Sequence, residues 1–265
     1  MSSSTPDPVA GHRDPPAAPV EGTVKGAVEG TLEGAVEGAA HGVVVAVDGT
    51  SGSGKSSTSR GVAARLGMRY LDTGAMYRAV TWWMVSHGVD VHDPAAVAAR
   101  AGEPVVESGT DPDAPTIHLD GVDVAVEIRS DAVNAAVSPV SVVPEVRARL
   151  AEQQRAEIRA ALATGPGIVV EGRDIASVVW PEAAVKVFLS ADPEARAARR
   201  AAEQGGTDVG ATRESLLERD RIDSGRATAP LTMVDGAAHV DTTSHTLDEV
   251  VDRVVALVEA ARVDA

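Results

Sequence analysis

The chain of 265 residues contains no cysteine, and aromatic residues make up only 2% of it. The absence of cysteine excludes disulfide bonds, thiolate nucleophiles and cysteine-ligated metals, and it is consistent with a reducing compartment. Hydrophobic residues still account for 44% of the chain, so we expect a core built from valine, alanine, leucine and isoleucine. The length is sufficient for one α/β domain with additions, or for two small domains.

Positive charge is also scarce, since the formal net charge is −15. Such an excess of acid argues against a surface that binds nucleic acid or anionic membrane throughout. There is no run of about 18 apolar residues that would predict a transmembrane helix. The N-terminus lacks the basic segment followed by an apolar one that is typical of a secretory signal. We therefore expect a cytoplasmic protein, acting as a monomer, with no nucleic-acid or membrane partner.

Only three lysines occur, at Lys25, Lys55 and Lys186. Nearly all the remaining positive charge is therefore arginine, which binds phosphate in the bidentate manner that lysine cannot reproduce.

Residues 1–41 differ in composition from the rest of the chain. The first twenty are rich in serine, proline, aspartate and alanine, and glycine then recurs at every fourth position from Gly22 to Gly42. This spacing is that of a membrane helix-pairing motif, but the segment's glutamates would be too costly in hydrocarbon. Glycine at every fourth position also weakens a soluble helix. We expect a disordered, low-complexity tail over 1–41, with a docking segment as the alternative, followed by one domain over 42–265.

From residue 43 onward, apolar runs of strand length alternate with helical patterns. Strands are predicted at 43–47, 69–73, 167–171, 185–189 and 239–243. Helices are predicted at 55–66, through Tyr77 and Trp83, at 144–165, at 192–204, at 212–224, and from Thr246, where Glu249 has capping-box spacing. The alternation predicts an α/β fold with a mostly parallel sheet and helices on both faces. The stretch 103–129 interrupts this rhythm with short strand-like pieces between turn signals, which indicates an inserted antiparallel element.

Residues 49–56, GTSGSGKS, match the phosphate-loop pattern G-x-x-x-x-G-K-[S/T] in full. The glycines let successive backbone N–H groups converge on phosphate oxygens, and the helix that follows adds positive potential at its N-terminus. Lys55 is expected to reach the β- and γ-phosphates, and the Ser56 hydroxyl is expected to bind Mg²⁺. The predicted ATP-binding residues are Gly49, Thr50, Ser51, Gly52, Ser53, Gly54, Lys55, Ser56 and Ser57.

The rest of the chain narrows the class of phosphate-loop protein. A GTPase would carry an Asn-Lys-x-Asp element for reading guanine, and neither lysine outside the loop lies in that setting. A motor or AAA-type ATPase needs a larger apparatus for coupling to its partner than the residues outside the tail can form. Of these classes of phosphate-loop protein, the sequence therefore favours a small kinase.

Clusters of arginine follow the predicted strands and helices. Transfer to an acceptor that is itself a phosphate needs cations and alignment rather than a strong general base. Arg78 comes soon after the strand 69–73, and Arg173 and Asp174 come directly after the strand 167–171, at the sheet edge where α/β proteins bind ligands. Further arginines share a helix face in ERDRIDSGR. We interpret these clusters as an acceptor site; a solvated, salt-bridged surface is the alternative.

Several charged residues allow two interpretations. Asp174 is interpreted as a recognition residue, because the acceptor needs no deprotonation. Glu171 either holds Mg²⁺ through water or is a strand-end carboxylate. Arg196, Arg199 and Arg200 share a helix face beside a glycine-containing loop, where they either close on ATP phosphates as part of a lid or are surface charges.

Six segments, in this order, resemble the bacterial cytidylate kinases of the nucleoside monophosphate kinase family. The segments are DGTSGSGKSS, YLDTGAMYR, VEIRS, SPVSVVPEVRARL, EGRDIASVVWPEAAVKVFL and ERDRIDSGRATAPL. The resemblance covers residues 43–262 and leaves the tail outside. It implies a three-layer P-loop fold with a central parallel sheet, a small antiparallel insert at about 103–129 in the monophosphate-binding region, and a short lid at about 200–213.

The resemblance also implies an activity, the transfer of the γ-phosphate of ATP, with Mg²⁺, to CMP or dCMP in pyrimidine nucleotide metabolism. The residues it implies for the cytosine or ribose side are Thr73, Ser138, Arg147 and Asp174, with Asp223 holding ribose hydroxyls. Those it implies for the acceptor phosphate are Arg78, Arg173, Arg219 and Arg226. Lys55, Arg173, Arg219 and Arg226 are the expected catalytic residues.

The chain departs from the family pattern at two places. Thr73 stands where serine is common and keeps the hydroxyl, and Gly225 precedes Arg226 where a side chain is more usual. We expect the glycine to loosen Arg226. Two alternatives stay open: a P-loop kinase for UMP, dTMP or shikimate, and a nucleotide-dependent switch or binding protein that uses the tail as an interaction arm.

Overall fold

The computed structural model describes residues 42–203, 205–206, 208–226 and 228–263. The tail predicted over 1–41 lies outside the described residues.

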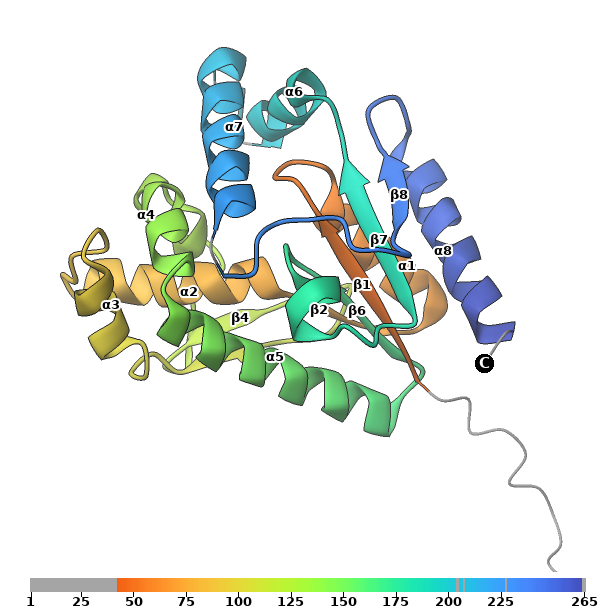
Figure 1. The fold of residues 1–265 in the computed structure, drawn as a ribbon, viewed down its shortest axis with the longest axis horizontal. Coiled ribbons are helices and arrows are strands. Elements are labelled where there is room, and N and C mark those ends of the chain that lie inside the picture. Colours follow the sequence, from red (N-terminus) through yellow and green to blue (C-terminus); the bar gives the residue numbers. More distant parts are fainter. Residues whose placement is uncertain (1–41, 204, 207, 227, 264–265) are drawn as a thin grey trace, which may run out of the picture. The chain divides into compact units, whose positions relative to one another are not determined.

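Five parallel strands form the central sheet, in the order β2-β6-β1-β7-β8 (Figure 1). Their bounds are β1 Val43–Gly49, β2 Arg69–Asp72, β6 Gly167–Glu171, β7 Val185–Ser190 and β8 Ala238–Asp241. The central strand β1 is buried along its whole length. A strand covered on both faces takes apolar residues at every position, which accounts for the unbroken run of valine and alanine that begins β1.

Helices cover both faces of this sheet, as the sequence predicted. On one face, α1 (Lys55–Leu66) and α8 (Leu247–Val263) pack against alternate valines of β1. On the other face, α2 (Thr73–Ser86) and α5 (Pro144–Thr164) pack against Val44 and Ala46. The predicted three-layer α/β fold is therefore confirmed.

The interruption predicted over 103–129 is a small antiparallel sheet. Its strands are β3 (Val106–Ser108), β4 (Ile117–Leu119) and β5 (Val122–Asp123), in that order. Asp120 and Gly121 join β4 to β5 with positive φ at both positions, 51° and 79°, as a two-residue hairpin of this twist requires. The buried side of the sheet joins the same apolar core as α2.

The described ranges contain six further helices. They are α3 Pro94–Arg100, the 3₁₀-helix η1 Glu127–Arg129, α4 Asp131–Ser141, the π-helix η2 Ile175–Val179, α6 Pro193–Glu203 and α7 Val209–Gly225. The sequence did not predict α3 or α4, which are short. The predicted start of α7 at residue 212 was wrong by three residues, because the side chain of Asp208 accepts a hydrogen bond from the Ala211 N–H and caps the helix earlier. The capping box of α8 is confirmed, with Thr246 and Glu249 exchanging hydrogen bonds of 2.8 and 3.3 Å.

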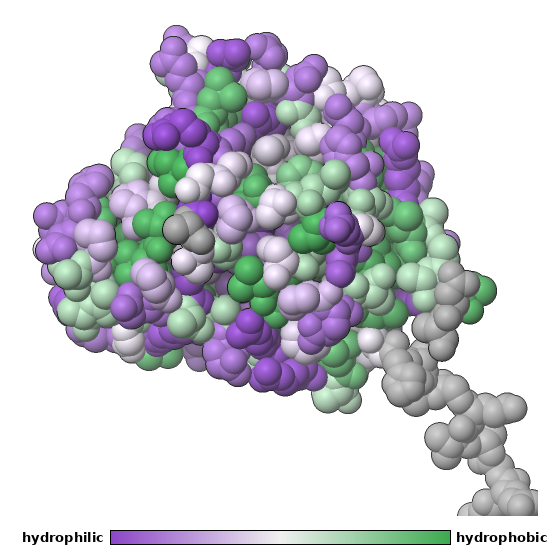
Figure 2. Space-filling view, in the orientation of Figure 1, coloured by the Kyte–Doolittle hydropathy of each residue, from purple (hydrophilic) through white to green (hydrophobic). Residues whose placement is uncertain are grey.

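No helix within the described ranges combines the length and apolar character needed to cross a membrane. Figure 2 shows hydrophilic and hydrophobic side chains interspersed on the visible face, with hydrophilic ones gathered at the top, where α6 and α7 lie in Figure 1.

Candidate active site

A cavity of about 370 Å³ opens where β1, β2 and β6 end. The phosphate loop follows β1, α2 begins directly after β2, and the segment around Arg173 follows β6. Helices α4, α5, α6 and α7 complete the walls. The volume is within the range of small-molecule sites.

The phosphate loop is shaped by its glycines. Gly49 has a φ of 151°, and a Cβ there would lie 2.0 Å from the carbonyl oxygen of Leu189, so no other residue fits. Helix α1 begins at Lys55 without a side-chain cap, since Gly54 precedes it. Its first N–H groups therefore have no side-chain cap and are available to an anion. Of the predicted ATP-binding residues, Ser51 to Ser57 line the cavity, whereas Gly49 and Thr50 bond through their carbonyl groups to Lys55.

Lys55 is buried beneath the loop. Its Nζ donates to the carbonyl oxygens of Gly49 at 3.0 Å and Thr50 at 2.6 Å. Burial, and then repulsion from Arg173, lower the pKa of Lys55 to about 7 against the attraction of Glu171. These surroundings therefore disfavour the charged ammonium, and a phosphate bound beside it would raise its pKa again.

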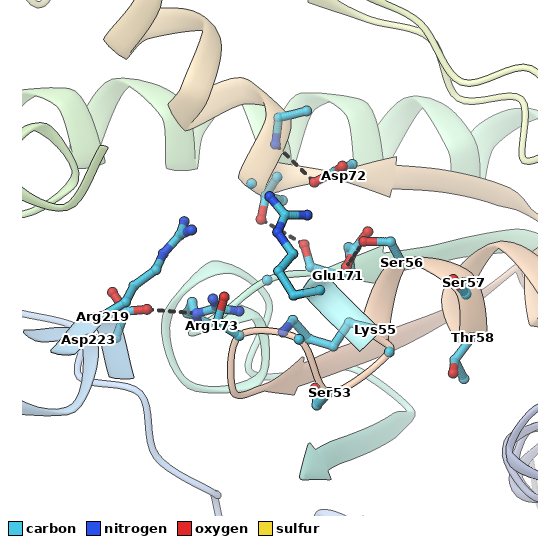
Figure 3. Close-up of a pocket in the computed structure, with 18 of the residues that line it drawn as sticks. Ser53, Lys55, Ser56, Ser57, Thr58, Asp72, Glu171, Arg173, Arg219 and Asp223 are labelled. Atoms are coloured by element: carbon cyan, nitrogen blue, oxygen red, sulfur yellow. Dashed lines mark hydrogen bonds and ion pairs between the residues drawn. The ribbon is translucent and has the colours of Figure 1, made fainter. Parts of the chain in front are cut away.

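Glu171 lies at the end of β6 and contacts Ser56 (Figure 3). The Ser56 Oγ donates to a Glu171 carboxylate oxygen at 3.0 Å, and the Tyr70 hydroxyl donates to the other. Burial, and then repulsion from Asp72, raise the pKa of Glu171 to about 7 against the attraction of Lys55. Because the hydroxyl proton of Ser56 is engaged by Glu171, the oxygen's lone pairs are left to face a cation. No group of three or more acidic or histidine side chains capable of holding a metal occurs in the described part of the chain.

Arg173 connects the phosphate loop to α7. Its Nε donates to Asp223 at 2.8 Å (Figure 3). Its Nη1 donates to the Gly49 carbonyl oxygen at 3.0 Å. Arg219, one turn before Asp223, has no ion-pair partner within the described residues. Burial and repulsion from Arg173 lower the pKa of Arg219 to about 10.

Arg226 and Arg78 complete a ring of cations around the acceptor end. Arg226 donates from Nε to the Asp223 carbonyl oxygen at 3.1 Å, and its side chain is 5% exposed. The expectation that Gly225 loosens this arginine was wrong, because the last turn of α7 holds it. Its Nη2 is buried with no hydrogen-bond partner among the described residues. Arg78 donates to the Ile128 carbonyl oxygen and to Asn134, both at 2.9 Å, and burial lowers its pKa to about 9.

A buried ion pair also lines the cavity, close enough to Arg226 to interact with its charge. Arg147 of α5 donates from Nη2 to the Asp174 carboxylate, and both side chains are 7% exposed. The Arg147 guanidinium also lies 5.6 Å from the centre of the Tyr77 ring. Thr73 lies beside this pair and donates its hydroxyl to the Glu171 carbonyl oxygen at 2.7 Å, so it can only accept from a ligand. Ser138 of α4 also lines the cavity.

The structure thus brings together every residue that the sequence predicted for the acceptor. All of them line this cavity: Thr73, Arg78, Ser138, Arg147, Arg173, Asp174, Arg219, Asp223 and Arg226.

The three arginines of α6 differ in their surroundings. Arg196 is buried and bonds to Asp220 and to the Ser51 carbonyl oxygen, so it is neither a surface charge nor free to close on a ligand. Arg199 donates to Thr242, Arg200 pairs with Glu203, and both line the cavity. The lid predicted at 200–213 contains residues 204 and 207, which lie outside the described residues.

Sequence reasoning missed Asp220. Its carboxylate accepts the Ser51 N–H at 3.0 Å and pairs with Arg196, which fixes the tip of the phosphate loop against α6 and α7. The two residues are 169 positions apart, so no local pattern could have indicated the contact.

The comparisons with known proteins point to one family. A family model described as "Cytidylate kinase" matches residues 45–260. A protein named cytidylate kinase from Streptomyces avermitilis is 59% identical over 222 residues, covering 83% of this chain and 94% of that protein. One of the same name from Streptomyces griseus subsp. griseus is 58% identical over 223 residues, covering 84% and 95%. Another, from Streptomyces coelicolor, is 57% identical over 220 residues, covering 83% and 94%.

Proposed function

The chain belongs to the cytidylate kinase family, and we propose on that basis that it transfers the γ-phosphate of ATP to CMP or dCMP, giving ADP with CDP or dCDP. The observation that supports this most is that Ser51 to Ser57 of the phosphate loop and all nine acceptor residues line the same cavity. Donor and acceptor can then meet in line without leaving the protein.

The donor half is the phosphate loop. Backbone N–H groups of the loop and of the start of α1 bind the β- and γ-phosphates, and Lys55 exchanges its bonds to the Gly49 and Thr50 carbonyl oxygens for phosphate oxygens. The Ser56 hydroxyl, oriented by Glu171, would hold Mg²⁺ together with the phosphates, with Glu171 reaching the ion through water. Bound there, Mg²⁺ supplies neutralisation of the phosphate charge.

The acceptor half is the ring of arginines. Arg78 and Arg226 bind the phosphate of CMP. The Nη2 of Arg226, which has no hydrogen-bond partner in the described part of the chain, supplies a buried donor for it. Arg173 and Arg219 stand between the two polyanions and stabilise the charge on the moving phosphoryl group. The attacking oxygen is an ionised phosphate oxygen, so no side chain has to remove a proton.

The Arg147–Asp174 pair is suited to reading cytosine. A carboxylate accepts from the exocyclic amino group at C4, as in cytosine recognition elsewhere. Uracil presents a carbonyl oxygen at the same place, which would face the Asp174 carboxylate without a donor. Buried polar groups left unpaired discriminate strongly, so we expect UMP to be a poor acceptor. Asp223 holds the ribose hydroxyls.

The proposal is tested with the purified full-length chain, ATP and MgCl₂, and a panel of CMP, dCMP, UMP, dTMP and shikimate, with the phosphorylated product measured. CMP and dCMP are expected to give the highest kcat/KM. Preference for another acceptor would contradict the proposal, as would ATP hydrolysis that CMP does not alter. A cytoplasmic location and a monomeric state remain predictions.

A further inference from the structure

Asp48 is a buried carboxylate on the core side of the central strand. Val44 and Ala46, which alternate with it along β1, lie in the apolar core that contains Ile175 and Ala176. Asp48 is only 4% exposed. Burial raises its pKa to about 6, with Asp174 adding to the rise and Lys55 opposing it. An ionised residue here costs folding free energy that an apolar residue would not, so the position calls for another explanation.

The carboxylate of Asp48 binds the first turn of another element. One oxygen accepts the N–H of Ile175 at 2.9 Å, and the other accepts the N–H of Ala176 at 2.8 Å. These two residues begin the π-helix η2. No ion pair to Asp48 occurs among the described residues. Asp48 therefore performs the hydrogen bonding of an N-cap residue from a distant part of the chain.

Asp174 occupies the N-cap position of η2 itself, but its side chain makes no capping hydrogen bond. Aspartate is among the residues that cap most readily. Its carboxylate instead accepts from Arg147 and lines the cavity. Because Asp48 caps the helix, the side chain of Asp174 can pair with Arg147 and line the cavity.

We propose that Asp48 is a positioning residue for the acceptor base, which acts by capping η2 in place of Asp174. This inference rests on the proposed function, since it takes Asp174 and Arg147 as the pair that reads cytosine. Without the Asp48 carboxylate, the N–H groups of Ile175 and Ala176 are buried without acceptors. Asp174 then turns back to cap its own helix, and Arg147 loses its partner.

The first test is Asp48→Asn, which keeps the size of the side chain but offers only one acceptor oxygen. We expect the KM for CMP to rise by about tenfold or more, while the KM for ATP changes by less than about threefold. The ratio of kcat/KM for CMP to that for UMP is expected to fall. Asp93→Asn is the matched control: Asp93 caps α3 conventionally through the Ala95 N–H at 2.9 Å, is exposed, and is absent from the cavity wall. The control should leave both KM values unchanged.

The second test asks whether Asp48 acts through Asp174. If it does, Asp48→Asn adds little to Asp174→Asn, and the double variant resembles the single Asp174 variant in its KM for CMP. Independent, multiplying effects would overturn the proposal, as would equal rises in the KM for CMP and for ATP. Asp48→Asn is used in both tests rather than Asp48→Ala, because the amide still offers one acceptor to the buried N–H groups and so preserves the fold.

Different results would refute the proposed function and the proposed role of Asp48. A wild-type chain that does not phosphorylate CMP would refute the proposed function. A wild-type chain that does, with an Asp48→Asn variant of unchanged KM, would refute only the role of Asp48. Amide exchange at Ile175 and Ala176, followed by NMR without any nucleotide, gives a readout apart from activity. Exchange should be faster in Asp48→Asn than in the wild type, and equal rates would show that the cap is not made.

Discussion

Replacing Arg219 by alanine should separate activity from stability. Arg219 lies among other cations and has no ion-pair partner in the described part of the chain, and its pKa falls from an ordinary 12.5 to about 10, chiefly through burial. Each pKa unit corresponds to about 1.4 kcal/mol, so these surroundings disfavour the charged side chain by about 3 kcal/mol. The protein maintains this unfavourable charge where a transferred phosphoryl group would pass.

We therefore expect Arg219→Ala to lower kcat by about 10²–10³-fold, the loss typical for a preorganised group that stabilises transition-state charge. The KM values for ATP and CMP should change little. The Tm of the ligand-free protein should stay the same or rise, because repulsion with Arg173 is relieved. For a domain of this size, each kcal/mol recovered raises Tm by about 2–4 °C.

The assay is steady-state kinetics with both substrates varied, combined with thermal unfolding without nucleotide. Arg221→Ala is the matched control, since Arg221 lies on the same helix but is exposed and, among the described residues, forms its ion pair with Glu218 alone. The control should change neither kcat nor Tm appreciably. A kcat within fivefold of wild type for Arg219→Ala would refute the transition-state role. A Tm lower by several degrees would show that Arg219 is a structural partner instead.

Three further predictions concern the base, the donor and the tail. Arg147→Ala or Asp174→Ala should raise the KM for CMP far more than the KM for ATP in steady-state assays. Equal effects on both KM values would show that these residues do not bind the base. Each variant should also have a lower Tm, because one member of a buried ion pair is left without its partner. ATP binding should take up protons between pH 7 and 9, because the bound phosphate raises the lowered pKa of Lys55 again. The affinity for ATP should therefore fall as the pH rises above about 7. Calorimetry in buffers of different ionisation enthalpy measures the proton uptake, and no uptake at pH 8 would contradict the role of Lys55. Deleting residues 1–41 should leave kcat/KM for both substrates essentially intact, and a loss of activity would show that the tail contributes to the site.

The sequence predicted the parts of the site that depend on local pattern. The phosphate loop is a contiguous motif, and Arg173 with Asp174 follows a recognisable buried strand, so the carboxyl-edge rule for parallel sheets brought them together correctly. The strand–helix alternation likewise predicted the layers of the fold, because burial on both faces leaves a continuous apolar run.

Contacts made by docking of distant helices could not be predicted in the same way. The bonds from Asp220 to Ser51 and from Arg196 to the loop depend on where α6 and α7 pack. Asp48 belongs to the same class, since its partners are two backbone N–H groups more than a hundred residues away. The expectation that Gly225 loosens Arg226 failed for a similar reason. The preceding glycine favours a mobile backbone, but the carbonyl oxygen of Asp223, three residues earlier, accepts a hydrogen bond from the Arg226 side chain and holds it.

Donor and acceptor phosphates are proposed to occupy one site and to react directly. The most direct measurement is to supply ATP labelled in its γ-phosphate together with CMP and MgCl₂, and to follow the label and the ratio of ADP to CDP. The account predicts that the label appears in the β-phosphate of CDP, with one CDP formed for each ADP. Label released as inorganic phosphate, at a rate that CMP does not change, would contradict it.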